Sequence, residues 1–164
     1  MIKVLLAAGC SLALAGCMHM SRSSTVTALP AADAGQLKVT DIKVTVGEGV
    51  KVTPQFQDIF REHVQKKLDV CATGQRPVRL EAQVDRLDKS NAVLTAVVAG
   101  ANVLRGSAKL VDVATGQTIA DYAVGQTVVG GRFAVVVMAE AEEQLSDGFG
   151  DELCKQAFPT VSKK

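Results

Sequence analysis

Hydrophobic and polar residues alternate along several stretches of the chain, and this pattern predicts β-strands. Over residues 37–46, the side chains of Ile42, Val44 and Val46 share one side while polar residues occupy the other, as in a strand with one buried face. The same alternation predicts further strands over residues 77–88, 92–98, 104–111 and 118–124. Asp112 to Gly116 separates the last two runs, and its glycine favours a hairpin turn between them.

Two other stretches repeat their apolar residues every three or four positions, which predicts amphipathic helices. The first covers residues 54–70, where Thr53 is expected to cap the helix and Pro54 to occupy its first position. The second covers residues 133–158 and contains glycines that are expected to weaken its middle. Its solvent-facing side is predicted to be acidic and to consist of Glu140, Glu142, Glu143, Asp147, Asp151 and Glu152.

Taken in order, the predicted elements are β-α-β-β-β-α. This order predicts the α+β class, with an antiparallel or mixed sheet and two helices packed on one face. We expect one domain over residues 37–158, followed by a polar C-terminal tail over residues 159–164. Residues 17–36 are rich in small and polar residues and keep no period, so they are predicted to be a flexible tether before the domain.

The N-terminal residues have the layout of a secretory signal peptide. Lys3 supplies a positive charge, an apolar run follows from Val4 to Ala15, and small residues precede Cys17. The apolar run is about 12 residues long, whereas a membrane-spanning helix needs ~20. Residues 1–16 are therefore predicted to be a removable signal and not a permanent membrane span.

The end of the apolar run, Leu14-Ala15-Gly16-Cys17, resembles the lipobox of bacterial lipoproteins, in which an aliphatic residue and two small residues precede a cysteine. The resemblance implies that the thiol of Cys17 receives a diacylglyceryl group. It also implies cleavage between Gly16 and Cys17, so that Cys17 becomes the first residue of the mature protein. Two or more acyl chains give stable anchoring to a bilayer, whereas one chain does not.

Two further residues bear on which cysteine is lipidated and on which membrane holds the protein. Cys10 also follows two small residues, but its motif lacks the aliphatic position and the apolar run before it is short. In the lipoprotein family, aspartate directly after the cysteine favours retention in the inner membrane, and here that position is Met18. The resemblance therefore implies a protein anchored in the outer membrane, with its body facing the periplasm.

The remaining cysteines, Cys71 and Cys154, form an even pair in a compartment that favours oxidation. We predict a disulfide between them. A redox or metal-binding pair and two buried free thiols are the alternatives, although the chain has no C-x-x-C motif. A bridge would close a loop of roughly 80 residues, which contributes about 4 kcal/mol in the chain-entropy model.

The body of the chain resembles a group of small bacterial lipoproteins without a defined function. The resemblance rests on the order of elements, on the Asp112-x-x-Thr115-Gly116 hairpin and on Gly130-Gly131 before the last helix. These proteins are similar to the periplasmic domain of the curli-secretion lipoprotein and to the N-terminal domain of the Tol-system propeller protein. The resemblance covers about residues 37–158 and implies no site residues.

Composition and motifs argue against nucleic-acid binding and catalysis. The 164-residue chain has 18 basic and 17 acidic residues and a formal net charge of +1, so no electrostatic footprint for nucleic acid is expected. Catalytic patterns such as G-x-S-x-G and H-E-x-x-H are absent. Met18-His19-Met20 contains soft metal ligands, but three residues of a tether make a poor cage. We therefore predict no catalytic residue, metal or cofactor.

These observations predict a non-enzymatic envelope protein, attached to the membrane by its N-terminal lipid, that docks a protein partner during assembly or export. The alternative is a periplasmic lipoprotein that binds a lipid or small apolar molecule for a transport system. The apolar run over residues 92–104 is most simply a buried strand. If it formed an exposed patch it would favour docking, whereas a deep cavity with convergent polar groups would favour ligand binding.

Overall fold

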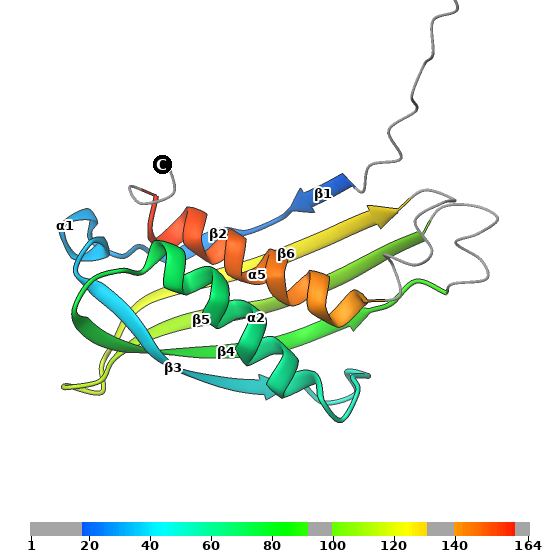
Figure 1. Cartoon of the computed structure of the whole chain (residues 1–164), viewed down its shortest axis with the longest axis horizontal. Coiled ribbons are helices and arrows are strands. Elements are labelled where there is room, and N and C mark those ends of the chain that lie inside the picture. The colour runs from blue at the N-terminus through cyan, green and yellow to red at the C-terminus, as the bar shows by residue number, and fades with distance from the viewer. Residues whose placement is uncertain (1–17, 92–99, 131–139, 160–164) are drawn as a thin grey trace, which may run out of the picture.

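The computed structural model describes residues 18–91, 100–130 and 140–159, and these form a six-stranded sheet with helices on one side (Figure 1). The strands are β1 (Met18–Ser21), β2 (Ser24–Thr27), β3 (Leu37–Val46), β4 (Arg76–Asp88), β5 (Gly100–Asp112) and β6 (Thr118–Gly130). The helices are α1 (Ala31–Ala34), α2 (Phe56–Cys71) and α5 (Ala141–Ala157). The strand order is β1-β6-β5-β4-β3, with β2 also paired to β6. The predicted α+β class is confirmed.

The sheet is mixed. β3 and β4 are parallel, and α2 is the crossover that joins them. The remaining described strand pairs are antiparallel. The predicted hairpin joins β5 to β6, where Gly116 has a φ of +69° and the Asp112 carboxylate accepts a hydrogen bond from the Thr115 amide at 2.9 Å. β3 has the bounds that its alternating pattern predicted.

Helices α2 and α5 lie side by side across one face of the sheet and cover the core (Figure 1). Phe56, Phe60 and Phe149 are fully buried between the layers, and the ring centroids of Phe60 and Phe149 are 4.9 Å apart. Burying one such side chain contributes about 1.5–3 kcal/mol. The sheet supplies the opposing apolar layer, which includes Val78, Leu80, Val84, Leu104, Ala108, Leu110, Tyr122 and Val124.

Two glycines of α5 permit close packing. A Cβ atom on Gly150 would lie 2.7 Å from the Cβ of Lys67 on α2, and one on Gly148 would lie 2.5 Å from the Cγ of Gln126 on β6. The helix continues through both positions without interruption. These glycines therefore provide space for neighbouring side chains, and the helix is not broken where we expected it to be weak.

The N-terminal part of the described chain differs from the predicted tether. β1 pairs with β6 from Met18 opposite Val129 onward, and β2 continues along the same edge. Farther along, the amide of Leu29 donates a hydrogen bond to the buried Tyr122 hydroxyl at 3.2 Å. Because both faces of β1 and β2 are exposed, their sequence needs no alternation, and pairing with the free edge of β6 satisfies their backbone groups. The folded body therefore includes strands that precede residue 37, from Met18 onward.

β6 also extends beyond the predicted strand and ends at Gly130. Gly125 lies within it, where a Cβ atom would stand 2.5 Å from the carbonyl oxygen of Arg22 and 2.6 Å from Nη1 of Arg105. This glycine thus permits a close approach and does not end the strand. The predicted strand over residues 92–98 and the predicted start of the last helix lie outside the described residues.

Candidate functional site

The face of the sheet opposite α2 and α5 is not covered by any other described helix or strand (Figure 1). We call it the open face. Its side chains alternate with the core residues of the same strands, as the two-residue period of a strand requires. At its centre lies a shallow depression of about 150 Å³ on β3, β4 and β5. The polar residues that line the depression are Lys43, Thr45, Glu81, Gln83, Ser107 and Lys109.

Charges alternate in one row across the open face. Lys43 on β3 lies opposite Glu81 on β4, and Glu81 lies opposite Lys109 on β5. Lys109 in turn lies opposite Asp121 on β6. Each cross-strand pair of opposite charge contributes only about 0.2–1 kcal/mol to the free energy of folding. The row therefore adds little to the stability of the fold. The next row is neutral and consists of Thr45, Gln83, Ser107 and Ala123.

A buried carboxylate joins three segments at the other side of the sheet. The Glu142 side chain, at the start of α5, is only 4% exposed and accepts a hydrogen bond from Lys89 Nζ at 2.5 Å. It also accepts hydrogen bonds from the amide of Thr53, at 2.9 Å, and from the Thr53 hydroxyl. Burial by itself raises the pKa of Glu142, but the donors Lys89 and Thr53 outweigh it and leave this pKa below the usual range.

This cluster corrects two predictions. Glu142 does not belong to the solvent-facing side of the last helix, because Lys89, just after β4, provides a buried carboxylate with a counter-charge. Glu152, predicted on the same side, is also buried, and Lys155 Nζ lies 3.7 Å from its carboxylate. Thr53 does not cap the first helix, because its hydroxyl is engaged by Glu142 and α2 begins only at Phe56. An open hollow of about 410 Å³ lies beside the cluster, with Lys51, Val52, Thr53, Leu87, Asp88 and Lys89 around it.

A second buried carboxylate, that of Asp112, stabilises the opposite end of the sheet. It accepts hydrogen bonds from the amide and hydroxyl of Thr115, and it forms an ion pair with Arg76 at 2.6 Å. The backbone donor of Thr115, followed by Arg76, lowers the pKa of Asp112. The Asp112-x-x-Thr115-Gly116 pattern noted in the sequence is therefore explained by the geometry of the hairpin.

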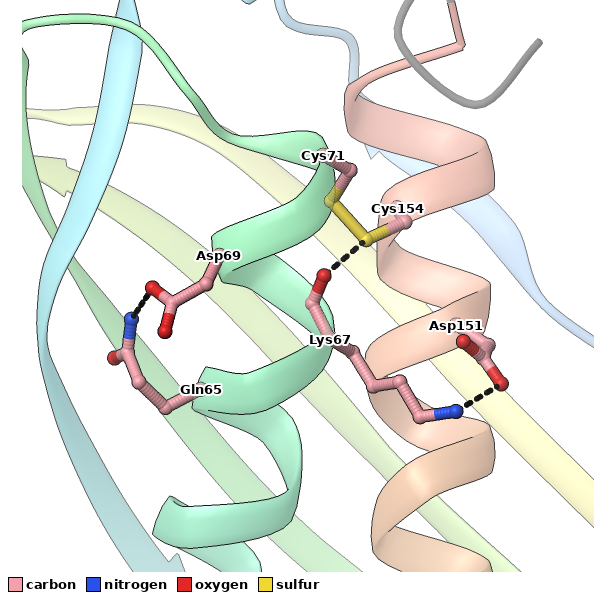
Figure 2. The surroundings of a disulfide bond; sticks show 6 residues. All are labelled: Gln65, Lys67, Asp69, Cys71, Asp151 and Cys154. Atoms are coloured by element: carbon pink, nitrogen blue, oxygen red, sulfur yellow. Dashed lines mark hydrogen bonds and ion pairs between the residues drawn. A yellow bond between two sulfur atoms is a disulfide. The ribbon is translucent and has the colours of Figure 1, made fainter. Parts of the chain in front are cut away.

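Cys71 and Cys154 form the predicted disulfide, with an S–S distance of 1.98 Å and Cα atoms 5.7 Å apart. Figure 2 shows that it joins the end of α2 to α5. The Sγ atom of Cys154 lies 3.4 Å from the carbonyl oxygen of Lys67, whose Nζ forms an ion pair with Asp151 at 3.0 Å (Figure 2). The bridge and this ion pair both tie the two helices together.

The other sequence-predicted positions fall into two groups. The predicted lipidation site Cys17 and its neighbour Gly16 lie outside the described residues. His19, in contrast, lies on β1 with its Nδ1 atom 3.2 Å from Gln126 Nε2. The alternation of a strand sends Met18 and Met20 to the opposite face from His19, so these three side chains do not converge on a metal.

Within the part of the chain that the structure describes, no group of three metal-ligating side chains converges, and no helix is long and apolar enough to cross a membrane. His63 on α2 is half-buried, and its Nδ1 atom lies 3.1 Å from the carboxylate of Asp147 on α5. The open face is the candidate functional site, because no other described helix or strand covers it. The sequence does contain its signal, in the polar positions that alternate with the predicted core.

No protein-family model and no curated protein matches the chain. The similar solved structures include the PelC dodecamer from Paraburkholderia phytofirmans, with 15% identity, a TM-score of 0.47, and coverage of 85% of this chain and 99% of that one. A single-substitution variant of the same dodecamer has 16% identity, a TM-score of 0.42, and coverage of 85% and 98%. A candidate lipoprotein from Caulobacter crescentus CB15 has 12% identity, a TM-score of 0.45, and coverage of 75% and 92%. Similarity at this level does not place the chain in a family.

Proposed function

We propose that this protein is a lipid-anchored docking factor of the bacterial cell envelope. In this proposal residues 1–16 are a signal peptide, cleavage occurs between Gly16 and Cys17, and Cys17 carries the lipid. The anchor holds the body at the periplasmic face of the outer membrane, where it binds a protein partner without catalysing a reaction. The Leu14-Ala15-Gly16-Cys17 motif supports the anchor.

The disulfide supports an extracytoplasmic location. A bridge between Cys71 and Cys154 forms and persists in oxidising compartments such as the periplasm, and is rare in the cytosol. Both cysteines are buried, and they join two structural helices rather than border a catalytic group. We therefore interpret the bridge as a stabilising element suited to an exported protein.

The open face is the observation that carries the docking proposal. A sheet face of this size is usually covered by a second layer, yet no other described helix or strand covers this one. Its centre carries the row of alternating charges formed by Lys43, Glu81, Lys109 and Asp121, with Arg79 paired to Glu81 at 3.1 Å beside that row. Alternating signs complement a protein surface with the reverse alternation, whereas a polyanion such as nucleic acid is matched by a surface of one sign. We infer that the partner is a protein of mixed charge.

The buried carboxylates and the hollow beside Glu142 favour docking over catalysis and over the binding of a lipid or small apolar molecule. The buried carboxylates Glu142 and Asp112 are engaged by neighbouring donors within the fold, which leaves them poorly placed for acid–base work. The hollow beside Glu142 is open and has three charged residues on its rim, Lys51, Asp88 and Lys89. It therefore lacks the enclosed apolar walls that a carrier of lipid needs.

Two experiments test the proposal. The first compares the cell fractions of the wild type and of Cys17→Ala, with the expected result that only the wild type remains in the outer membrane. If Cys17→Ala keeps the same membrane fraction and the same mass as the wild type, the lipid anchor is refuted.

The second experiment places a photo-crosslinking amino acid at Ser107 on the open face or, as a control, at the exposed Lys66 on α2. We expect Ser107 to crosslink to a discrete envelope protein, Lys66 not to do so, and Lys109→Glu to abolish the product. Equal crosslinking from both positions, or a product that is insensitive to Lys109→Glu, would contradict docking at the open face.

A further inference from the structure

Met18, the residue that follows the predicted lipidation site, lies at one end of the sheet. β1 begins at Met18, which follows Cys17 in the chain, and Met18 is already in register with Val129 of β6. Adjacent Cα atoms are about 3.8 Å apart. A lipid on Cys17 is therefore attached to the sheet without a spacer, so this inference rests on the lipid anchor of the proposed function.

The surface next to this attachment point is apolar. Met18 and Met20 are 64% and 48% exposed and lie on the same side of β1, since they are two residues apart. Across the sheet, Met18 is followed by Val129 and Ala101, and Met20 is followed by Thr127 and Val103. We call this surface the corner patch, and it consists of Met18, Met20, Ala101, Val103, Thr127 and Val129.

The corner patch belongs to the same face as the charged row but differs from it in chemistry. Moving along β5 from the hairpin toward its first residue, the open face passes from the polar residues Lys109, Ser107 and Arg105 to Val103 and Ala101.

An anchored lipid determines which partner this patch meets. The acyl chains of Cys17 hold the patch within a few ångströms of the bilayer, at a local concentration that a freely diffusing partner does not reach. Each methylene group that leaves water for the bilayer strengthens membrane binding. The thioether side chains Met18 and Met20 therefore add to the anchor without any further loss of freedom for the chain.

We propose that the body stands on the phospholipid bilayer with its corner patch in contact with the lipid surface. The opposite end of the sheet, at the β5–β6 hairpin with the exposed residue Val113, points into the periplasm. This arrangement leaves the charged row of the open face above the membrane and accessible to a protein.

The chain contains no tryptophan, so single tryptophans report on individual positions. Three variants of the full, lipidated protein serve as probes: Met20→Trp in the corner patch, Thr45→Trp in the neutral row of the open face, next to the charged row, and Val113→Trp at the hairpin. All three positions are exposed, and far-UV circular dichroism checks that each variant folds. Met18 remains unchanged because it follows the lipidated residue.

Each variant is reconstituted into phosphatidylcholine vesicles with or without bromine atoms on the acyl chains. We expect brominated lipid to quench Met20→Trp fluorescence severalfold and to leave Val113→Trp unchanged, since a strand of the length of β6 separates the two ends by about 40 Å. Thr45→Trp is expected to be quenched weakly or not at all.

Mass spectrometry of the N-terminal peptide separates the two ways in which the proposal can fail. If the peptide is lipidated and the protein is bound to vesicles but Met20→Trp is not quenched, the body stands away from the membrane and the inference is refuted while the anchor remains. Equal quenching of Met20→Trp and Val113→Trp also refutes it, because the body then lies flat. If the peptide is not lipidated, both the proposed anchor and this inference are refuted.

Discussion

The two faces of the sheet use the same strands for different purposes. The face beneath α2 and α5 is formed by side chains such as Leu80 and Leu110, which are fully buried. The adjacent residues of the same strands, Glu81 and Lys109, lie on the open face. Glu81 is half-buried and Lys109 is exposed. Neighbouring residues of one strand thus meet entirely different surroundings, because successive side chains point to opposite sides.

This difference separates stability from recognition. The covered face contributes most of the hydrophobic free energy and is further tied by the Cys71–Cys154 bridge and the Glu142 cluster. The open face contributes little to folding, so its side chains are available for a partner. Substitutions on the covered face should therefore lower stability, whereas substitutions on the open face should weaken partner binding with little change in stability. Four experiments test this difference, from the largest expected change in stability to the smallest.

The largest effect is expected from the helix layer. Phe60→Ala removes a fully buried ring that packs between Phe56 and Phe149. Such a truncation should lower the free energy of unfolding by about 3–5 kcal/mol, measured by urea denaturation. The exposed Lys66 on the same helix provides the control, since Lys66→Ala should change it by less than about 0.5 kcal/mol.

Removal of the disulfide should have the next largest effect. The double variant Cys71→Ala, Cys154→Ala is expected to lose about 2–4 kcal/mol of stability, because its unfolded chain is no longer closed into a long loop. Thermal unfolding of the variant and of the reduced wild type should agree. A variant as stable as the oxidised wild type would mean that the bridge contributes nothing to the fold.

The buried ion pair should have a smaller, pH-dependent effect. Glu142→Gln should cost about 1–3 kcal/mol at neutral pH, because it leaves Lys89 without its carboxylate. The pKa of Glu142 is lowered in the folded protein, so its contribution is complete above the unfolded value of about 4.3. That contribution is lost as the pH falls through the lower folded value.

Urea titrations between neutral and acidic pH measure this contribution. The wild type should lose stability relative to Glu142→Gln as the pH falls, until the two curves converge. Glu143→Gln is the matched control on the same helix, where Glu143 is less buried, and it should follow the wild type. Parallel curves for the wild type and Glu142→Gln would show that the ion pair adds no pH-dependent stability.

The smallest change in stability, and the largest in recognition, is expected on the open face. Lys109→Glu places a third negative charge beside Glu81 and Asp121, which should cost less than about 1 kcal/mol. Glu81→Lys is the complementary change. If docking uses the charged row, each variant should lose its partner in pull-down from envelope extracts while its melting temperature shifts by only a few degrees.

Much of the helix-covered layer could be predicted because it depends on local patterns. The two-residue period of Ile42, Val44 and Val46, and the helical spacing of Phe56, Phe60 and Val64, each indicate one buried side. The order of these elements was sufficient for the α+β class. The disulfide followed from the two cysteines that remain once Cys10 is assigned to the signal and Cys17 to the lipid, in a compartment that favours oxidation.

The features that were missed depend on contacts between distant segments. In the sequence, Glu142 is one of several acidic residues with the same local pattern, and only the fold brings Lys89 and Thr53 beside it. β1 and β2 were missed because both their faces are exposed, so that no hydrophobic period marks them. The sequence shows which residues of each strand are polar and alternate with the core. It does not show which of them lie opposite one another on neighbouring strands, because that depends on the register of the sheet.

The pairing of β1 and β2 with β6 also has a consequence for the folding pathway. Ser23 and Gly125 are in contact although 102 residues separate them in sequence, so this edge cannot close before β6 has been synthesised. Contacts between such distant positions form slowly because a long loop must close first. The hairpin of β5 and β6 needs only a short loop. We therefore expect β1 and β2 to pair with β6 last. If the N-terminus is already attached to the membrane, this pairing step brings the folded body close to the membrane.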